Sequence, residues 1–129
     1  MPRLAKLFAA GGALAIAATC AKPAPLAPKP SPAATFASDP VAVKRGKSLF
    51  IGMCGAYCHG LRGGARGDIP DLFDCAWKNG GSDEEIFRSI SDGVPGTRMD
   101  GFAGVLPDGD TDIWKLVAFL RASSSCTKK

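Results

Sequence analysis

The apolar positions between residues 40 and 53 recur at the spacing of one helix face. They lie three or four residues apart, at Val43, Gly46, Phe50 and Met53. Asp39 can cap the first turn, and Pro40 suits that turn because its missing N–H would have no helical partner there. A glycine on a buried helix face is unfavourable unless another segment must come close, so Gly46 indicates a close approach.

Two further helices are expected, and no strands. The helix at residues 110–121 begins with capping residues at 110–112 and carries an apolar stripe formed by Ile113, Leu116, Val117 and Leu120. A shorter helix starts at Ser82, has Glu85 as its capping-box partner and stops before Gly93. The other stretches are rich in Gly and Pro and show no alternation of apolar and polar residues. The pattern predicts an all-α fold with long loops.

The first 38 residues read differently from the rest. Residues 1–21 have a basic start, a short apolar stretch and small residues after it, which is the layout of a secretory signal peptide. Residues 22–38 are rich in Ala and Pro, with five prolines, and predict an extended, solvated tether. The folded domain is therefore expected at residues 39–129.

Cys20 has two interpretations. Cleavage after Ala21, at a site of small residues, would discard it with the signal. Alternatively, Cys20 is the acylated cysteine of a lipoprotein, which a tether that lifts the domain off a membrane would suit. Both interpretations place the domain in the periplasm, either free or held to the membrane by a lipid on Cys20.

The formal charge of +4 belongs to the leader and the tether. Four of the 16 basic residues lie there, so residues 39–129 carry 12 basic and 12 acidic residues. Nucleic-acid binding needs a basic domain face, and this domain has no net charge to supply one. The composition therefore excludes nucleic acid as the expected partner.

The chain has a single histidine, His59, directly after Cys58 and five residues after Cys54. Cys-x-x-Cys-His is the attachment motif of c-type haem, in which two thiols add to the porphyrin vinyl groups and the imidazole binds iron. Here the gap holds one extra residue. Gly55 and Ala56 have little or no side chain, so a locally loosened turn could absorb it.

The remaining sulfur atoms have their own expected roles. Cys75 and Cys126 can form a disulfide in an oxidising compartment, or they are two unrelated free thiols. For the second axial position of a haem, Met1 lies in the leader and Met53 lies beside the attachment motif, which leaves Met99. The alternatives are an open iron site or a lysine such as Lys78.

From about residue 41 to residue 122 the chain resembles a small class I cytochrome c with one haem. The matching elements are Gly46 and Phe50, the cluster of Cys54, Cys58, His59 and Gly60, and the stretches 69–72, 95–99 and 118–121. The resemblance implies that the first and last helices cross where Gly46 meets Phe119, with loops wrapped round the haem. It also implies that the carbonyl group of Pro70 accepts a hydrogen bond from His59.

The function implied by this resemblance is electron transfer without catalysis, by a monomer in the periplasm. Its partners would be redox proteins of the respiratory chain, such as a dehydrogenase, a quinol-oxidising complex, a terminal oxidase or a peroxidase. Arg62, Arg66 and Arg98 are candidates for steering an acidic partner, although each also suits an ordinary solvated surface.

Several alternatives remain open. One is a gas or peroxide sensor or enzyme with an open iron site, and another is the haem subunit of a dehydrogenase complex. A third is a structural zinc site formed by Cys54, Cys58, His59 and Cys75. A thiol-disulfide oxidoreductase is disfavoured because no βαβ pattern surrounds the cysteines.

Overall fold

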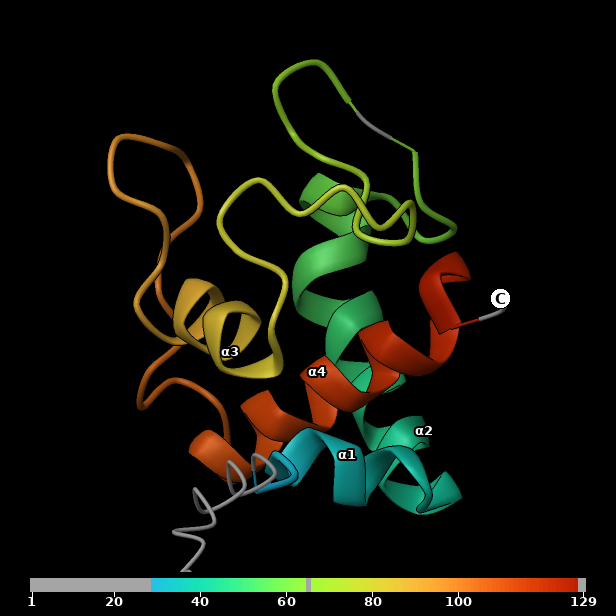
Figure 1. Ribbon diagram of the computed structural model, residues 1–129. Coiled ribbons are helices and arrows are strands. Elements are labelled where there is room, and N and C mark those ends of the chain that lie inside the picture. The colour runs from blue at the N-terminus through green and yellow to red at the C-terminus, as the bar shows by residue number, and fades with distance from the viewer. Residues whose placement is uncertain (1–28, 65, 128–129) are drawn as a thin grey trace, which may run out of the picture.

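The computed structural model describes residues 29–64 and 66–127, and within these ranges the chain is helical (Figure 1). Besides the helices, the described ranges contain loops and isolated bridges between single residues but no strand, so the prediction of an all-α fold is confirmed. No helix in these ranges is long and apolar enough to span a membrane. The elements are α1 (Pro32–Ala37), α2 (Pro40–Leu49), the π-helix η1 (Phe50–His59), α3 (Asp83–Ser91), α4 (Asp110–Ser123) and the 3-10 turn η2 (Ser125–Thr127).

Helix α2 crosses α4 so closely that only glycine fits at the contact. A Cβ atom added at Gly46 would lie 2.0 Å from the carbonyl oxygen of Lys115 and 2.9 Å from the Cβ atom of Phe119. These distances are far below van der Waals contact, so the backbone of α2 rests directly on α4. The expected meeting of Gly46 with Phe119 is confirmed.

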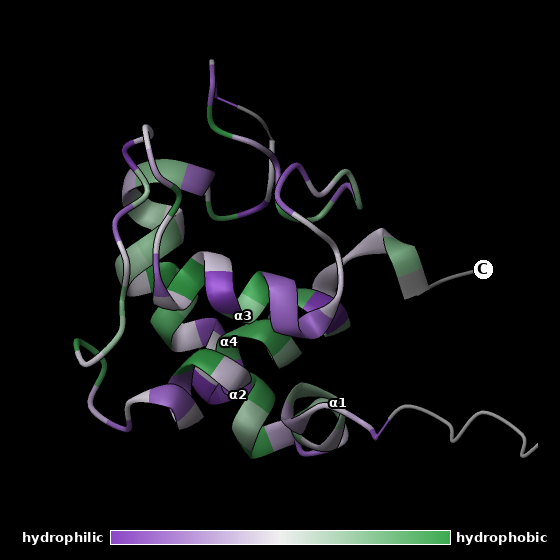
Figure 2. Cartoon of the chain, turned by 60° about the vertical axis from the view of Figure 1, so that its left-hand side comes forward, coloured by the Kyte–Doolittle hydropathy of each residue, from purple (hydrophilic) through white to green (hydrophobic). Residues whose placement is uncertain are grey.

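The core forms around α4. Among the described helices, α4 (Figure 2) contributes the most buried apolar residues, which are Ile113, Leu116, Val117, Ala118, Phe119 and Leu120. Phe119 belongs to a group of three aromatic rings, with centroids 5.4 Å from Phe50 and 6.0 Å from Phe73. The rings tie α4 to the start of η1 and to the loop after it, and those two segments carry the candidate site.

The first turn of α4 is stabilised differently from the prediction. Gly109 occupies the N-cap position, and no side chain caps this end. Asp112, which the sequence placed among the capping residues, is fully buried and binds the Arg45 guanidinium of α2, at 3.0 Å from Nε to Oδ1 and 2.7 Å from Nη2 to Oδ2. The hydrogen bonds from Arg45 lower the pKa of the Asp112 carboxyl group. Asp112 thus joins two helices.

The other two predicted helices begin as expected. Asp39 caps α2 by accepting a hydrogen bond from the backbone N–H of Val41, and Ser82 and Glu85 form the predicted capping box of α3. The first helix, expected to run to residue 53, leaves α-helical geometry at Leu49 and continues as η1 (Figure 1). The change of winding therefore covers the whole cysteine and histidine motif.

The end of the predicted tether is not extended. Pro32–Ala37 form α1, which packs against α4 and buries Ala33 in the core (Figure 1). Ser31 caps α1 and donates a hydrogen bond to the carboxylate of Asp83, at the start of α3. The prolines mislead because Pro32 stands at the first turn, where proline favours a helix. The predicted signal peptide, Cys20 and the first part of the tether lie outside the described residues.

Candidate haem-binding site

One cavity of about 340 Å³ gathers the residues that the sequence singled out. Its wall includes Cys54, Cys58 and His59 from η1, Pro70 from the following loop, and Met99 from the loop before α4. Most of the remaining wall is apolar and comes from α3, α4 and the loop at residues 71–80. Residues up to 70 positions apart in sequence, Phe50 and Leu120, thus share one pocket. The folded chain can present two thiols, an imidazole and a thioether to a single bound group.

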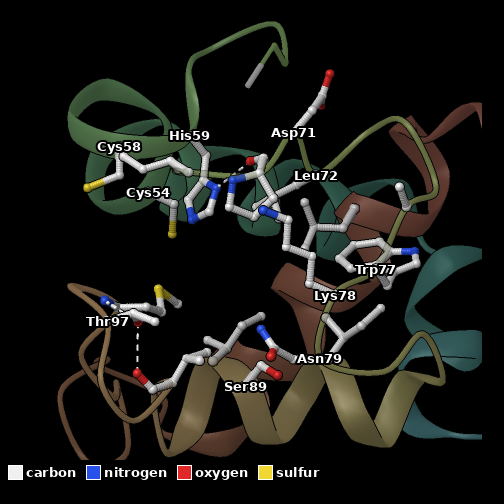
Figure 3. A pocket seen from close by; sticks show the side chains of 18 of the residues that line it. Cys54, Cys58, His59, Asp71, Leu72, Trp77, Lys78, Asn79, Ser89 and Thr97 are labelled. Carbon is white, nitrogen blue, oxygen red and sulfur yellow. Dashed lines mark hydrogen bonds between the residues drawn. The ribbon is translucent and has the colours of Figure 1, made fainter. Parts of the chain in front are cut away.

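His59 is held in a defined orientation. Its side chain is buried, with 8% of the residue exposed, and its Nδ1 atom lies 3.0 Å from the carbonyl oxygen of Pro70. A carbonyl oxygen can only accept, so Nδ1 carries the hydrogen and Nε2 keeps its lone pair. Figure 3 shows this second nitrogen directed into the cavity, toward the side on which Thr97 lies. His59 is therefore arranged as a metal ligand would be.

Cys54 and Cys58 are free thiols, whereas Cys75 and Cys126 form a disulfide with Cα atoms 5.5 Å apart. Burial, followed by the neighbouring Cys58, raises the pKa of the Cys54 thiol to about 11, so this thiol is protonated near neutral pH. With Cys75 engaged in the disulfide, the proposed zinc site lacks one ligand. Among the described residues no cluster of histidine, cysteine and carboxylate side chains suits a metal ion.

The loop that carries Met99 is closed by its own hydrogen bonds. The N–H of Val94 donates to the carbonyl oxygen of Met99 at 2.9 Å, and the N–H of Met99 donates to Oγ1 of Thr97 at 3.1 Å. The Thr97 hydroxyl group donates in turn to the carbonyl oxygen of Val94 at 2.7 Å. Met53 packs against the core, but it does not line the cavity. Among the described residues, Met99 is thus the methionine that lines the pocket.

The pocket wall also includes Trp77 and Asn79, on either side of Lys78, two residues that the sequence did not single out. Trp77, Lys78 and Asn79 line the pocket in succession (Figure 3), and the buried Nε1 atom of Trp77 has no hydrogen-bond partner among the described residues. A buried donor without a partner is costly. Arg121 lies over the Trp77 ring, 5.8 Å from its centroid. The only sequence signal was a tryptophan in a Gly-rich loop.

These residues fit a haem c. The thiols suit its vinyl groups, His59 and Met99 suit its iron, the apolar wall suits its ring, and the polar side chains of Lys78 and Asn79 suit its two propionates. Lys78 also stays available as an alternative iron ligand, because it lines the same pocket.

Of the three candidate arginines, only Arg98 lines the pocket. Arg98 donates a hydrogen bond to Asp68 at 2.8 Å, and both side chains are largely exposed, at 72% and 76%. Its charge is therefore partly neutralised by a neighbour, which weakens the case for Arg98 in steering a partner. Arg62 and Arg66 are exposed on the loop that follows η1.

Comparison with known proteins agrees with this geometry. The chain is 37% identical over 65 residues to the "Cbb3-type cytochrome c oxidase subunit CcoP" of Rubrivivax gelatinosus, a stretch that is 50% of this chain and 21% of that protein. The chain thus spans about a fifth of its relative. The solved structure of cytochrome CL from the marine methylotrophic bacterium Methylophaga aminisulfidivorans MPT matches with a TM-score of 0.61 at 25% identity, over 69% of this chain and 57% of that one.

The structural match confirms the class I cytochrome c fold expected from the sequence. Residues 41–120, which include η1, the Met99 loop and most of both crossing helices, match the family described as "Cytochrome C oxidase, cbb3-type, subunit III". The chain therefore belongs to this family of c-type cytochromes, whose members carry covalently bound haem c and transfer electrons.

Proposed function

We propose that this chain is a one-electron carrier of the periplasm with a single haem c. Cys54 and Cys58 form its thioether links, His59 and Met99 are its axial ligands, and Pro70 orients the imidazole. The observation that carries the proposal is the single pocket lined by all five residues, in which both thiols are free. Bound there, haem supplies a one-electron couple between ferrous and ferric iron.

Pro70, Met99 and the apolar wall each affect the chemistry of a bound haem. The carbonyl group of Pro70 accepts the Nδ1 hydrogen of His59, and this hydrogen bond makes the lone pair of Nε2 a stronger ligand for iron. Met99 offers a soft sulfur atom, and the apolar wall disfavours added positive charge, so both favour the reduced state. The reduction potential should therefore be higher than that of a haem with two histidine ligands.

A second candidate role is that of a haem subunit in a larger electron-transfer complex. The family description and the name of the relative, a subunit of a cbb3-type oxidase, favour it. Both roles use the same pocket and differ in the partner. Haem-stained native electrophoresis of detergent-treated whole cells that produce the chain would separate them, because a subunit migrates with a large complex, whereas a carrier migrates alone.

Visible spectroscopy and intact mass of the exported protein test the proposal. A low-spin spectrum in both oxidation states, with the weak long-wavelength band that sulfur ligation gives ferric haem, is expected. A mass increase of one haem should accompany it. A high-spin spectrum would instead favour the open iron site of a gas or peroxide sensor, and a mass without haem would refute the proposal.

The same mass measurement addresses the predicted leader. Removal of residues 1–21 would show cleavage after Ala21 and a carrier that moves freely in the periplasm. A mature chain that begins at Cys20 with added acyl groups would show a lipid anchor. Either result agrees with a periplasmic carrier, whereas an uncleaved, unmodified chain in the cytoplasm would contradict it.

A further inference from the structure

The attachment motif lies in an unusual helix. Residues Phe50–His59 form the π-helix η1, which continues directly from α2 and contains both cysteines and the histidine. π-Helical geometry is rare, and short stretches of it often mark functional sites. The motif is unusual in sequence as well, because three residues separate Cys54 from Cys58, one more than the common spacing. The two irregularities coincide.

Helical geometry explains why they should coincide. In an α-helix each residue turns the chain by about 100°, so cysteines three apart fall about 60° short of a full turn and cysteines four apart pass it by about 40°. In α-helical geometry one added residue would therefore rotate Cys54 by about 100° relative to Cys58 and His59. A π-helix closes i→i+5 hydrogen bonds, so each residue turns the chain less. The wider turn reverses part of the added rotation.

Gly55 is the residue of the gap that faces inward. A Cβ atom at this position would lie 2.8 Å from Cε1 of Phe50, 3.2 Å from the carbonyl oxygen of Gly60 and 3.2 Å from Cδ2 of Leu61. Phe50 cannot retreat, because it is 1% exposed and packs against two other aromatic rings. The other gap residues, Ala56 and Tyr57, point outward and are exposed. A side chain at residue 55 would thus force the turn to open.

We propose that the π-helix adapts the three-residue gap to double haem attachment, and that Gly55 is the positioning residue that permits this winding. The inference rests on the proposed haem attachment. Each thiol adds across one vinyl group: an S–C bond forms, the thiol hydrogen passes to the other vinyl carbon, and no atom or electron is lost. Both additions need both sulfur atoms in place at once, which the wide turn provides.

Three variants of the full chain test this inference, each produced in a host that exports proteins and attaches haem. Gly55→Ala adds the methyl group that would meet Phe50. Gly52→Ala is the matched control, because a Cβ atom there meets nothing within 4 Å in the same π-helix. Deletion of Ala56 restores the common spacing. Denatured haem-bearing chains are alkylated without reduction, and their mass shows how many of the thiols at 54 and 58 stayed free.

The readout counts thioethers per haem-bearing chain, so a simple loss of folded protein does not change it. Wild type, Gly52→Ala and the deletion should show no alkylated thiol. For Gly55→Ala the ratio of doubly to singly attached haem should fall about tenfold, as expected when an extra methyl group overpacks a tight site. The shift of the reduced pyridine-haem band, which reports an unreacted vinyl group, should agree.

The outcomes separate this inference from the proposed function. Wild type without haem would refute the attachment itself. Wild type with two thioethers, together with equal ratios in Gly55→Ala and Gly52→Ala, would refute only the role of Gly55 and the π-helix. If Gly55→Ala yields no haem-bearing chain, the deletion decides: two thioethers support the inference, and loss of one overturns it.

Discussion

The crossing of α2 and α4 and the walls of the haem pocket are held together in different ways. At the crossing, the backbone at Gly46 touches α4 directly, and the buried Asp112 has its charge paired by Arg45. The pocket walls are largely loops, and they leave the thiols of Cys54 and Cys58 free. The crossing is complete within the protein, whereas the pocket is complete only with a ligand. Stability and cofactor chemistry therefore depend on different residues.

The largest effect is expected when a methyl group is added at the crossing of α2 and α4. In Gly46→Ala the new Cβ atom would overlap the carbonyl oxygen of Lys115, a backbone atom that cannot move aside. We expect the free energy of unfolding to fall by about 3 kcal/mol or more, enough to unfold much of a domain this small. Circular dichroism during urea unfolding measures it. Gly52→Ala, at an open site of η1, should cost much less, and equal losses would refute the close contact.

Loss of the disulfide should have the next largest effect. The bond closes a loop of 51 residues, and its removal in a Cys75→Ser, Cys126→Ser double variant should lower the free energy of unfolding by about 2 to 4 kcal/mol. Cys75 also has a φ angle of 72°, which residues other than glycine rarely adopt. The disulfide therefore holds the backbone of Cys75 in an unfavourable conformation.

A thiol reductant supplies the control for the disulfide. It should destabilise the haem-bearing wild type by the same amount and leave the double variant unchanged. A wild type that resists the reductant and a double variant of full stability would together contradict a stabilising link. Haem attachment should persist in both, because thioethers are not reduced by thiols.

Removal of the second axial ligand should change the haem far more than the fold. Met99→Ala removes a half-buried side chain, and the lost packing alone should lower the free energy of unfolding by about 1 kcal/mol. The loss of the bond to iron adds to this change. The reduction potential should fall by on the order of 0.1 V, within the roughly 0.8 V that axial ligands cover. Voltammetry and the long-wavelength band measure this change. Met53→Ala, outside the pocket, should retain both properties; if it loses them instead, Met53 is the ligand.

The smallest expected effect is the acid sensitivity of the crossing. Arg45 lowers the pKa of Asp112 in the folded chain, below the value of about 3.9 for an unfolded aspartate. The stabilisation is therefore complete above about pH 4 and disappears as the pH falls through the lowered pKa. Urea unfolding between pH 7 and pH 2 should show this loss. In Asp112→Asn this part of the acid dependence should vanish, whereas Asp110→Asn, an exposed change in the same helix, should retain it.

Sequence reasoning worked where the signal is local. Ser82 with Glu85, and Asp39 before Pro40, predicted helix starts because caps bond to backbone groups only two or three residues away. The cysteine and histidine motif predicted the chemistry of the pocket because its residues are neighbours in the chain. Elimination among three methionines indicated Met99, and this residue lines the pocket, while its role as an iron ligand stays a prediction.

Sequence reasoning failed where distant segments decide. The helical α1, the burial of Asp112 and the place of Trp77 all depend on distant contacts. These are the contacts of Ser31 with Asp83, of Arg45 with Asp112 and of Arg121 with the Trp77 ring, between residues 44 to 67 positions apart. The proline-rich stretch predicts an extended chain, but burial of Ala33 in the core outweighs the preference for an extended conformation. An aspartate near a helix start predicts a cap, but Asp112 instead binds the guanidinium group of Arg45 from another helix.

The sequence by itself determined the kind of site and the helices that carry it, because periodicity, caps and the order of donor residues act over a few positions. Only the tertiary structure decided how the extra residue of the motif is wound, which residue of the gap is buried and how the helices cross. These features depend on the space left by side chains from distant segments. Excluded volume between such segments has no signature in the local sequence.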